Sequence, residues 1–175
     1  SLRIAGGHFS GVHLHTFITN TGLQRAKALV QEGAEDAGRD PDQVRVHSVM
    51  ATALHPGRED YLRTLVGRMA TYMQAPGYAE MLIALNGWDR EVLAAFRAND
   101  TVASMPGGID SAASLEQLEE ISELIPDDWL PAATGTAQDC ARAWKDQLAN
   151  GADGVVIHGS TPMEFAPILD TYATL

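Results

Sequence analysis

The stretch from residue 129 to residue 160 constrains the fold more than any other part of the chain. It contains an apolar run, an amphipathic segment and a β-branched run, at residues 129–134, 137–150 and 154–158. Thr136 and Asp139 have the spacing of a helix capping box, which predicts that a helix begins between the two runs. Strand, helix and strand in this order form a right-handed βαβ unit with parallel strands. One such unit cannot bury its own sheet, so we expect further units.

Two earlier segments supply them. Residues 11–18 alternate, which puts Val12 and Leu14 on one face of a strand and His13, His15 and Phe17 on the other. An amphipathic helix is predicted at 23–37 and a second strand at 44–54. Counting the two runs above, four βα units result. The sequence therefore predicts an α/β fold that is half of a (β/α)8 TIM barrel, as one half-barrel domain over residues 1–175.

A helical insertion separates the second strand from the third, at about residues 57–127. Its predicted helices lie at 59–74, 78–85, 90–98 and 114–124, and a turn is predicted at Met105–Gly108. An insertion of this length is far longer than an ordinary connection between strands, so we interpret it as a lid or a subunit contact.

Composition and charge exclude several classes of protein. The formal net charge is -11, which argues against non-specific nucleic-acid binding, because such binding depends on Lys and Arg. There is no apolar run long enough for a membrane span and no signal-peptide pattern. The single cysteine, Cys140, cannot form an intrachain disulfide. We therefore expect a cytoplasmic protein without a membrane or nucleic-acid partner.

Three pieces of the sequence resemble a known family when taken in order. They are GGHFSGVHLHTFIT, EGAEDAGRDPDQVRVHSVMATALHP and TGTAQDCARAWKDQLANGADGVVIHG. They are similar to the fifth strand, the sixth strand with its preceding helix, and the seventh helix with the eighth strand of the luciferase-like monooxygenase superfamily, specifically its coenzyme F420 (deazaflavin)-dependent oxidoreductases. Strands similar to the first four of that barrel are absent. The resemblance thus implies that the chain is a C-terminal half-barrel.

The resemblance implies an oxidoreductase that transfers a hydride between a flavin or deazaflavin and a small organic substrate. F420 is preferred, with FMN as the alternative. The family places cofactor-phosphate or substrate contacts in the loop after the fifth strand, which here contains Thr16, Phe17 and Thr19. The rule that barrel enzymes act at the carboxyl ends of their strands selects the same loop.

Two histidines are the candidate catalytic residues. His15 and His158 each end a predicted strand on the inferred inner face, and histidine exchanges protons near neutral pH. The alternative is that both rings are polar fillers of the barrel interior. Gly135 and Thr136, and Gly159 after the last strand, are candidate phosphate-binding turns, although an ordinary helix cap also explains Thr136. No metal site is predicted, because no Cys or carboxylate has ligand spacing to the histidines.

Two other functions stay open. A half-barrel leaves sheet edges and an apolar interior uncovered, so the chain could be a non-catalytic assembly module that dimerises or completes a partner. The same uncovered surfaces lead us to expect a homo-oligomer. A different barrel enzyme, such as an aldolase, has weaker support, because Lys27 and Lys145 lie on predicted helices and not at strand ends.

Overall fold

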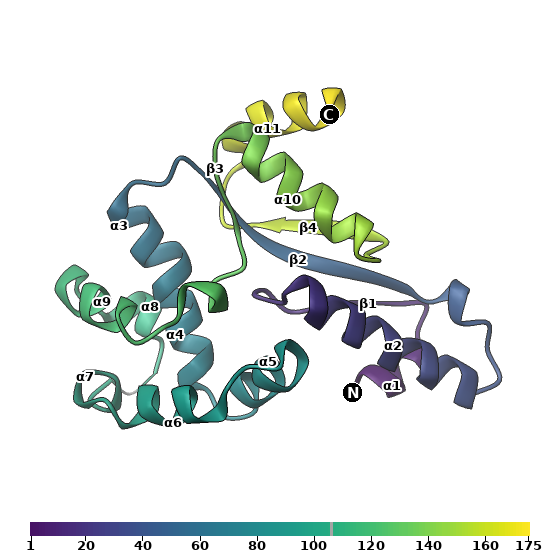
Figure 1. Ribbon diagram of the computed structural model, residues 1–175, viewed down its shortest axis with the longest axis horizontal. Coiled ribbons are helices and arrows are strands. Elements are labelled where there is room, and N and C mark those ends of the chain that lie inside the picture. Colours follow the sequence, from purple (N-terminus) through teal and green to yellow (C-terminus); the bar gives the residue numbers. More distant parts are fainter. Residues whose placement is uncertain (106) are drawn as a thin grey trace.

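The computed structural model describes residues 1–105 and 107–175 and shows a parallel four-stranded sheet surrounded by helices (Figure 1). The strands are β1 (Gly11–His13), β2 (Arg45–Leu54), β3 (Ala133–Gly135) and β4 (Gly154–His158). The helices are α1 (Leu2–His8), α2 (Asn20–Asp36), α3 (Arg58–Tyr61), α4 (Gly67–Gln74), α5 (Tyr78–Asn86), α6 (Arg90–Ala98), α7 (Asp100–Ala103), α8 (Ile109–Ala112), α9 (Leu115–Ser122), α10 (Ala137–Ala149) and α11 (Pro162–Thr174). A π-helical turn at Leu62–Val66 joins α3 to α4, and 3-10 turns lie at Pro41–Gln43 and Asp127–Trp129.

The long strand β2 organises the sheet, because each of the other strands pairs with it. Its first residues pair with β1, its middle residues with β4 and its last three residues with β3, all in parallel. The α/β class and the parallel strands predicted from the sequence are confirmed. The predicted bounds of β4 are confirmed without change, and those of β2 to within one residue.

The neighbour order differs from that of a barrel in which each strand pairs with the next along the chain. Arg45 N donates to Ser10 O and His55 N donates to Gly135 O, whereas Asp153 N donates to Val46 O. Backbone groups of adjacent residues in a strand point to opposite edges. The backbone groups of the odd-numbered residues of β2 thus point to the edge that holds β1 and β3. Strand β4 occupies the other edge, where a barrel with consecutive strand pairing would have β3.

Strand length gives the physical reason for this order. The strand predicted at 129–134 forms only as Ala133–Gly135, because Trp129 ends a 3-10 turn and Pro131 lacks a backbone donor. The β-branched residues of β4 form the longer ladder, five residues against three. The strand predicted at 11–18 is also short, Gly11–His13, and Leu14 N adds one further bond to His47 O.

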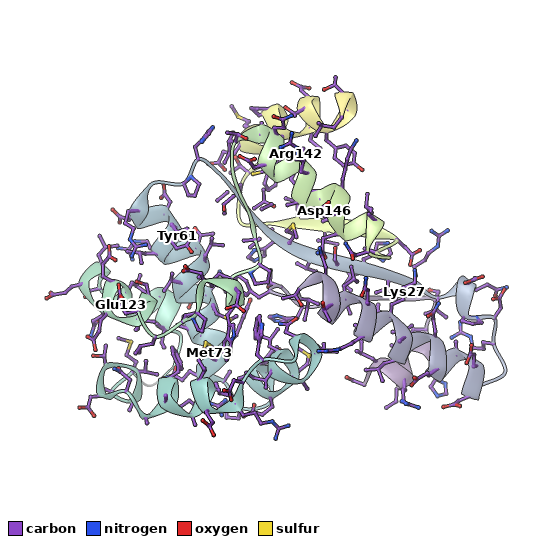
Figure 2. The ribbon with its side chains drawn as sticks, in the orientation of Figure 1. Lys27, Tyr61, Met73, Glu123, Arg142 and Asp146 are labelled. Carbon is purple, nitrogen blue, oxygen red and sulfur yellow. The ribbon has the colours of Figure 1, made fainter. Side chains whose placement is uncertain are left out.

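Helices cover the outer face of the sheet. Met50 of β2 packs with Trp144 of α10 and Ile168 of α11 in a small core, and the Trp144 Nε1 donates to the buried Thr52 hydroxyl at 3.1 Å. Val46 packs instead in the larger core, which includes α2 and the inserted helices. Lys27 of α2 donates to Gly151 O at 2.8 Å and so ties α2 to the turn before β4 (Figure 2).

The inner face of the sheet is less covered. Residues that pair directly across strands share a face, so His47 lies beside His13, and Val49 lies beside Val156. The His13 and His47 rings make an edge contact at 5.0 Å. Val49 and Val156 are half-buried and belong to neither core, while His13 is exposed. This face carries the side chains that sequence alternation assigned to a barrel interior.

The insertion between β2 and β3 is helical, as predicted, and packs around Met73 of α4 (Figure 2). Trp88, after α5, stacks on Trp129 with ring centroids 4.7 Å apart, so the inserted helices contact the segment that leads to β3. The turn predicted at Met105–Gly108 includes Pro106, which lies outside the described residues. Within the described part of the chain, no helix is long and apolar enough to cross a membrane.

Candidate functional site

The carboxyl ends of β1 and β4 meet the inserted helix α4 at Arg68. The Arg68 Nη1 lies 3.4 Å from Nε2 of His158, the last residue of β4. The Arg68 Nε lies 3.1 Å from Asp110 Oδ2 of α8, which is an ion-pair distance without hydrogen-bond geometry. Asp110 is itself fixed, because its backbone N donates to the Thr71 hydroxyl at 3.0 Å. Arg68 is thus held from the insertion and reaches the end of the sheet.

His15 belongs to the same group of side chains. It follows β1, and its ring makes edge contacts with Tyr72 at 4.3 Å and with Tyr78 at 5.1 Å. The two tyrosine rings are nearly parallel, with centroids 6.1 Å apart. Tyr72 is one helical turn after Arg68 in α4, so one helix face presents both residues to His15. The structure therefore brings the two sequence-predicted catalytic histidines to one place.

Burial and charge keep both histidines neutral. Desolvation lowers the pKa of His15, and the Arg68 charge lowers it further, although the bond to Thr16 O acts in the opposite direction. Desolvation also lowers the pKa of His158, with added contributions from Arg68 and from His15. Each ring is therefore uncharged at neutral pH, and a neutral imidazole offers one donor and one acceptor.

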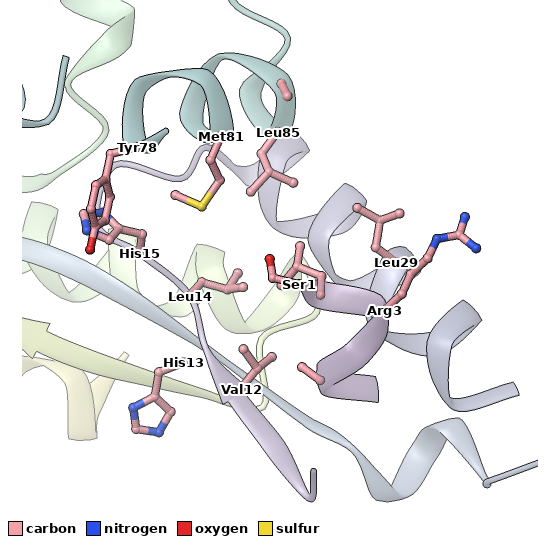
Figure 3. A pocket seen from close by; sticks show the side chains of 13 residues that line it. Ser1, Arg3, Val12, His13, Leu14, His15, Leu29, Tyr78, Met81 and Leu85 are labelled. Carbon is pink, nitrogen blue, oxygen red and sulfur yellow. The ribbon is translucent and has the colours of Figure 1, made fainter. Parts of the chain in front are cut away.

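A cavity of about 590 Å³ begins at His15 and Tyr78 (Figure 3). Its walls come from α1, β1, α2 and α5 and are mainly apolar, including Leu14, Met81 and Leu85. In Figure 3, Val12 and Leu14 point toward this space, while His13 points away, toward β4. Its volume is in the range of small-molecule sites. His158 is not part of its wall, so His15 is the residue that joins the cavity to the Arg68 group.

The other residues predicted in the loop after β1 are engaged in structure. Thr16 and Phe17 are buried, and Phe17 has a φ of 62°, which is left-handed. Asn86 of α5 donates to Phe17 O at 2.9 Å and accepts from Thr19 N at 2.9 Å. Thr19 caps α2 by accepting from Gly22 N. The side chains of Thr16 and Phe17 do not line the cavity, and the Thr19 hydroxyl serves as a cap.

The predicted turn at Gly135 and Thr136 is closed by its own helix. Asp139 accepts from Thr136 N at 3.0 Å and from the Thr136 hydroxyl at 2.6 Å, and Asp139 N donates back at 3.1 Å. The Asp139 carboxylate thus puts a negative charge beside the helix N-terminus, which disfavours a phosphate there. Gly159, with a φ of 103°, follows His158 and lies near Thr52 O and Thr64. Of these glycines, only Gly159 adjoins the Arg68 group.

Two functional candidates were missed by sequence reasoning, Arg68 and Asn86. Arg68 follows Leu65 by three residues and precedes Tyr72 by four, so it interrupts the apolar stripe of its helix. A charge on such a stripe was the available signal. Asn86 gave no signal, because its partners are 67 and 69 residues away. No group of three metal-ligating side chains gathers among the residues that the structure describes.

Comparison with known proteins finds similar structures. No protein-family model matches the chain, and no curated protein matches it. Its structure is similar to that of the coenzyme F420-dependent tetrahydromethanopterin reductase from Methanopyrus kandleri, with a TM-score of 0.63, 16% identity and coverage of 95% of this chain and 44% of that one. An F420-dependent secondary alcohol dehydrogenase, in complex with an F420-acetone adduct, gives a TM-score of 0.54 at 12% identity, covering 99% and 44%.

A long-chain alkane monooxygenase (LadA) gives a TM-score of 0.50 at 17% identity, covering 99% of this chain and 37% of that one. The chain thus spans less than half the length of each of these proteins. At such identities the similarity is one of fold. The resemblance predicted from the sequence is confirmed at that level: this chain has the fold of part of these two F420-dependent enzymes and of the alkane monooxygenase.

Proposed function

We propose that the chain is the C-terminal half-barrel of an oxidoreductase that uses F420, or alternatively FMN, to transfer a hydride to or from a small organic substrate. The observation that carries the proposal is the meeting of His15 and His158 at Arg68, from strand ends far apart in the sequence. Reactive groups of barrel enzymes gather at the carboxyl ends of their strands. The fold shared with two F420-dependent enzymes supports the cofactor class.

The residues at this place suit a flavin-like ring. Tyr72 and Tyr78 provide aromatic surface beside His15. The buried Nδ1 of His158 has no hydrogen-bond partner among the described residues, which leaves a polar atom free for a ring carbonyl or a substrate oxygen. Such a cofactor would supply the hydride chemistry itself. The chain would contribute binding, orientation and proton exchange.

In this mechanism His15 is the proton-exchanging residue. Its lowered pKa keeps a lone pair available at neutral pH, and its ring lies at the opening of the apolar cavity. Arg68 disfavours a second proton on either ring. The apolar walls would hold the hydrocarbon part of the substrate and exclude water from the reacting end.

Fluorescence titration with F420 and with FMN tests the proposal. We expect F420 to bind with a change in its fluorescence, and His158→Gln to weaken binding at least tenfold. The control is His8→Gln, because His8 is exposed at the end of α1 and lies outside the cavity wall. The absence of any fluorescence change with either cofactor would contradict the assignment.

A second function has its own observation. The inner face of the sheet is incompletely covered at Val49 and Val156, and within the described chain β1 pairs on one edge only. These features favour a module that dimerises or completes a partner barrel. Native mass separates the cases: a monomer that binds F420 excludes the assembly module, and a dimer that binds neither cofactor favours it.

A further inference from the structure

Arg68 constrains where the proton of His158 lies. The Arg68 Nη1 is 3.4 Å from the His158 Nε2. A guanidinium only donates hydrogen bonds, so the facing nitrogen must present its lone pair. The proton of the neutral ring is then on Nδ1. The lowered pKa of His158, caused by burial and by the charges of Arg68 and His15, agrees with a neutral ring.

The Nδ1–H group that results has no protein acceptor. His158 Nδ1 is buried and unpartnered among the described residues. Leaving a buried donor without an acceptor is unfavourable, so such a group in a native protein calls for a partner such as a bound molecule. The last residue of β4 therefore presents an unpaired hydrogen-bond donor.

His15 has the opposite arrangement. Its Nδ1 lies 3.3 Å from Thr16 O. A carbonyl oxygen only accepts, so this nitrogen carries the proton and Nε2 presents a lone pair. The two rings near Arg68 thus differ in chemistry: His158 offers an N–H at Nδ1, and His15 offers an acceptor at Nε2.

We propose that Arg68 is a positioning residue that fixes His158 as an Nδ1–H donor for a carbonyl or hydroxyl oxygen of a bound molecule. Asp110 forms an ion pair with the guanidinium through Nε, whereas His158 faces Nη1. The ligand's chemical class rests on the proposed function, whereas the position of the proton does not. A test in the absence of cofactor therefore separates failure of this inference from failure of the oxidoreductase assignment.

Nitrogen-15 NMR of the histidine side chains is the test, because the two tautomers have different ring-nitrogen shifts and couplings. We expect the Nδ1–H tautomer to predominate for His158 in the unmodified protein. Arg68→Met keeps an unbranched apolar stem and removes the guanidinium donor. It should shift His158 toward the Nε2–H tautomer, whereas Arg68→Lys, which keeps a cationic donor, should preserve Nδ1–H.

The matched control is Arg63→Met, because Arg63 belongs to the same helical run and pairs with Glu59 on the exposed surface. It should leave the His158 signals unchanged. If Arg68→Met does not fold, Asp110→Asn provides the second variant, with a smaller shift toward Nε2–H expected. An Nε2–H tautomer in the unmodified protein, or no response to Arg68→Met in a folded chain, would overturn the inference.

Discussion

The chain after β1 and the chain after β3 make the same turn in two different ways. Each leaves the carboxyl end of a strand and enters a helix through a threonine cap, Thr19 or Thr136. Thr136 is held by Asp139, three residues away. Thr19 is held by Asn86 of α5, 67 residues away. The first turn therefore depends on the inserted helices, and the second depends only on itself.

This difference bears on which turn can carry function. In the β3 turn, the Thr136 hydroxyl and the Asp139 carboxylate are bonded to each other. The β1 turn places His15 against Tyr72 and Tyr78 of the insertion. A cap held by a residue of its own helix fixes only that turn. A cap held by a residue of a distant element, here called a distant anchor, lets that element set the geometry of a reactive side chain. The following predictions test this contrast.

The largest effect is expected from Asn86→Ala. The change removes the acceptor for Thr19 N and the donor to Phe17 O, and it frees Phe17 from a left-handed backbone conformation. Because both backbone groups lose their partner in a buried place, we expect a loss of about 3 kcal/mol in the free energy of unfolding. Urea denaturation measures the loss, and the His15 NMR signals should shift.

Asn150→Ala is the matched control for Asn86→Ala. The Asn150 side chain makes its bonds on the surface, to Gln24 and Asp146. We expect less than about 1 kcal/mol for it and no change at His15. Equal losses for the two asparagine variants would show that the distant anchor has no special importance.

The pH dependence of stability is the second effect, because the histidines and Asp139 titrate in different pH ranges. The pKa values of His15 and His158 lie below the ordinary value of 6.5, so the unfolded chain binds more protons than the folded chain below that pH. Their contribution to stability is present above 6.5 and is lost as the pH falls. Asp139 also has a lowered pKa, caused by the Thr136 hydroxyl and backbone, and its contribution is lost only below its ordinary value of 3.8.

Urea midpoints at about pH 7.5 and about pH 5.5 measure this effect, because these values lie on either side of the ordinary histidine pKa. We expect lower stability at the lower pH. The double variant His15→Gln and His158→Gln should be less sensitive to pH. A pH dependence that survives in the double variant would assign the effect to other groups.

Thr136→Ala should have a smaller effect, confined to its own turn. Loss of a threonine N-cap costs about 1 kcal/mol of stability. Thr161→Ala removes the same kind of capping box from α11 and should cost a similar amount. Neither change should move the His15 signals, in contrast to Asn86→Ala. A shift of His15 in Thr136→Ala would break the distinction between a local and a distant anchor.

The smallest effect is expected at the other end of α5, from Glu80→Gln. Arg97 and the backbone lower the pKa of Glu80 to about 2. The carboxylate is exposed, so we expect a loss of about 0.5 kcal/mol, present above its ordinary pKa and lost as the pH falls toward 2. Added salt should reduce the difference from the unmodified protein. A loss as large as that of Thr136→Ala would mean that α5 is anchored at both ends.

Local signals in the sequence predicted local structure well. The β-branched run predicted the bounds of β4. The predicted bounds of α6 are also correct, and Asp89 caps the N-terminus of this helix. Helix α1 was not predicted, because Gly6 and its neighbour Gly7 are poor helix formers. The structure uses Gly6 for close approach: a Cβ there would lie 1.9 Å from Val30 O of α2. Tertiary packing, which no local pattern reveals, forms this helix.

The candidate site was half predictable for the same reason. Alternation and strand position selected His15 and His158, because each lies at or near the end of a predicted strand. Arg68 became visible only when the insertion folded over the strand ends. The short lengths of β1 and β3 likewise depend on how many residues of β2 are available for pairing. Strand propensity does not describe this tertiary effect.

The pairing of every strand with β2 has a consequence for the order of folding. Val46 N bonds to the Asp153 carboxylate across 107 residues, so the central strand must wait for the end of the chain before its second edge is filled. Contacts of such long range close slowly, whereas the inserted helices are made of near neighbours in sequence. During synthesis the insertion can therefore fold first, with β2 exposing an open edge until β4 emerges. Chaperone demand should be greatest in that interval.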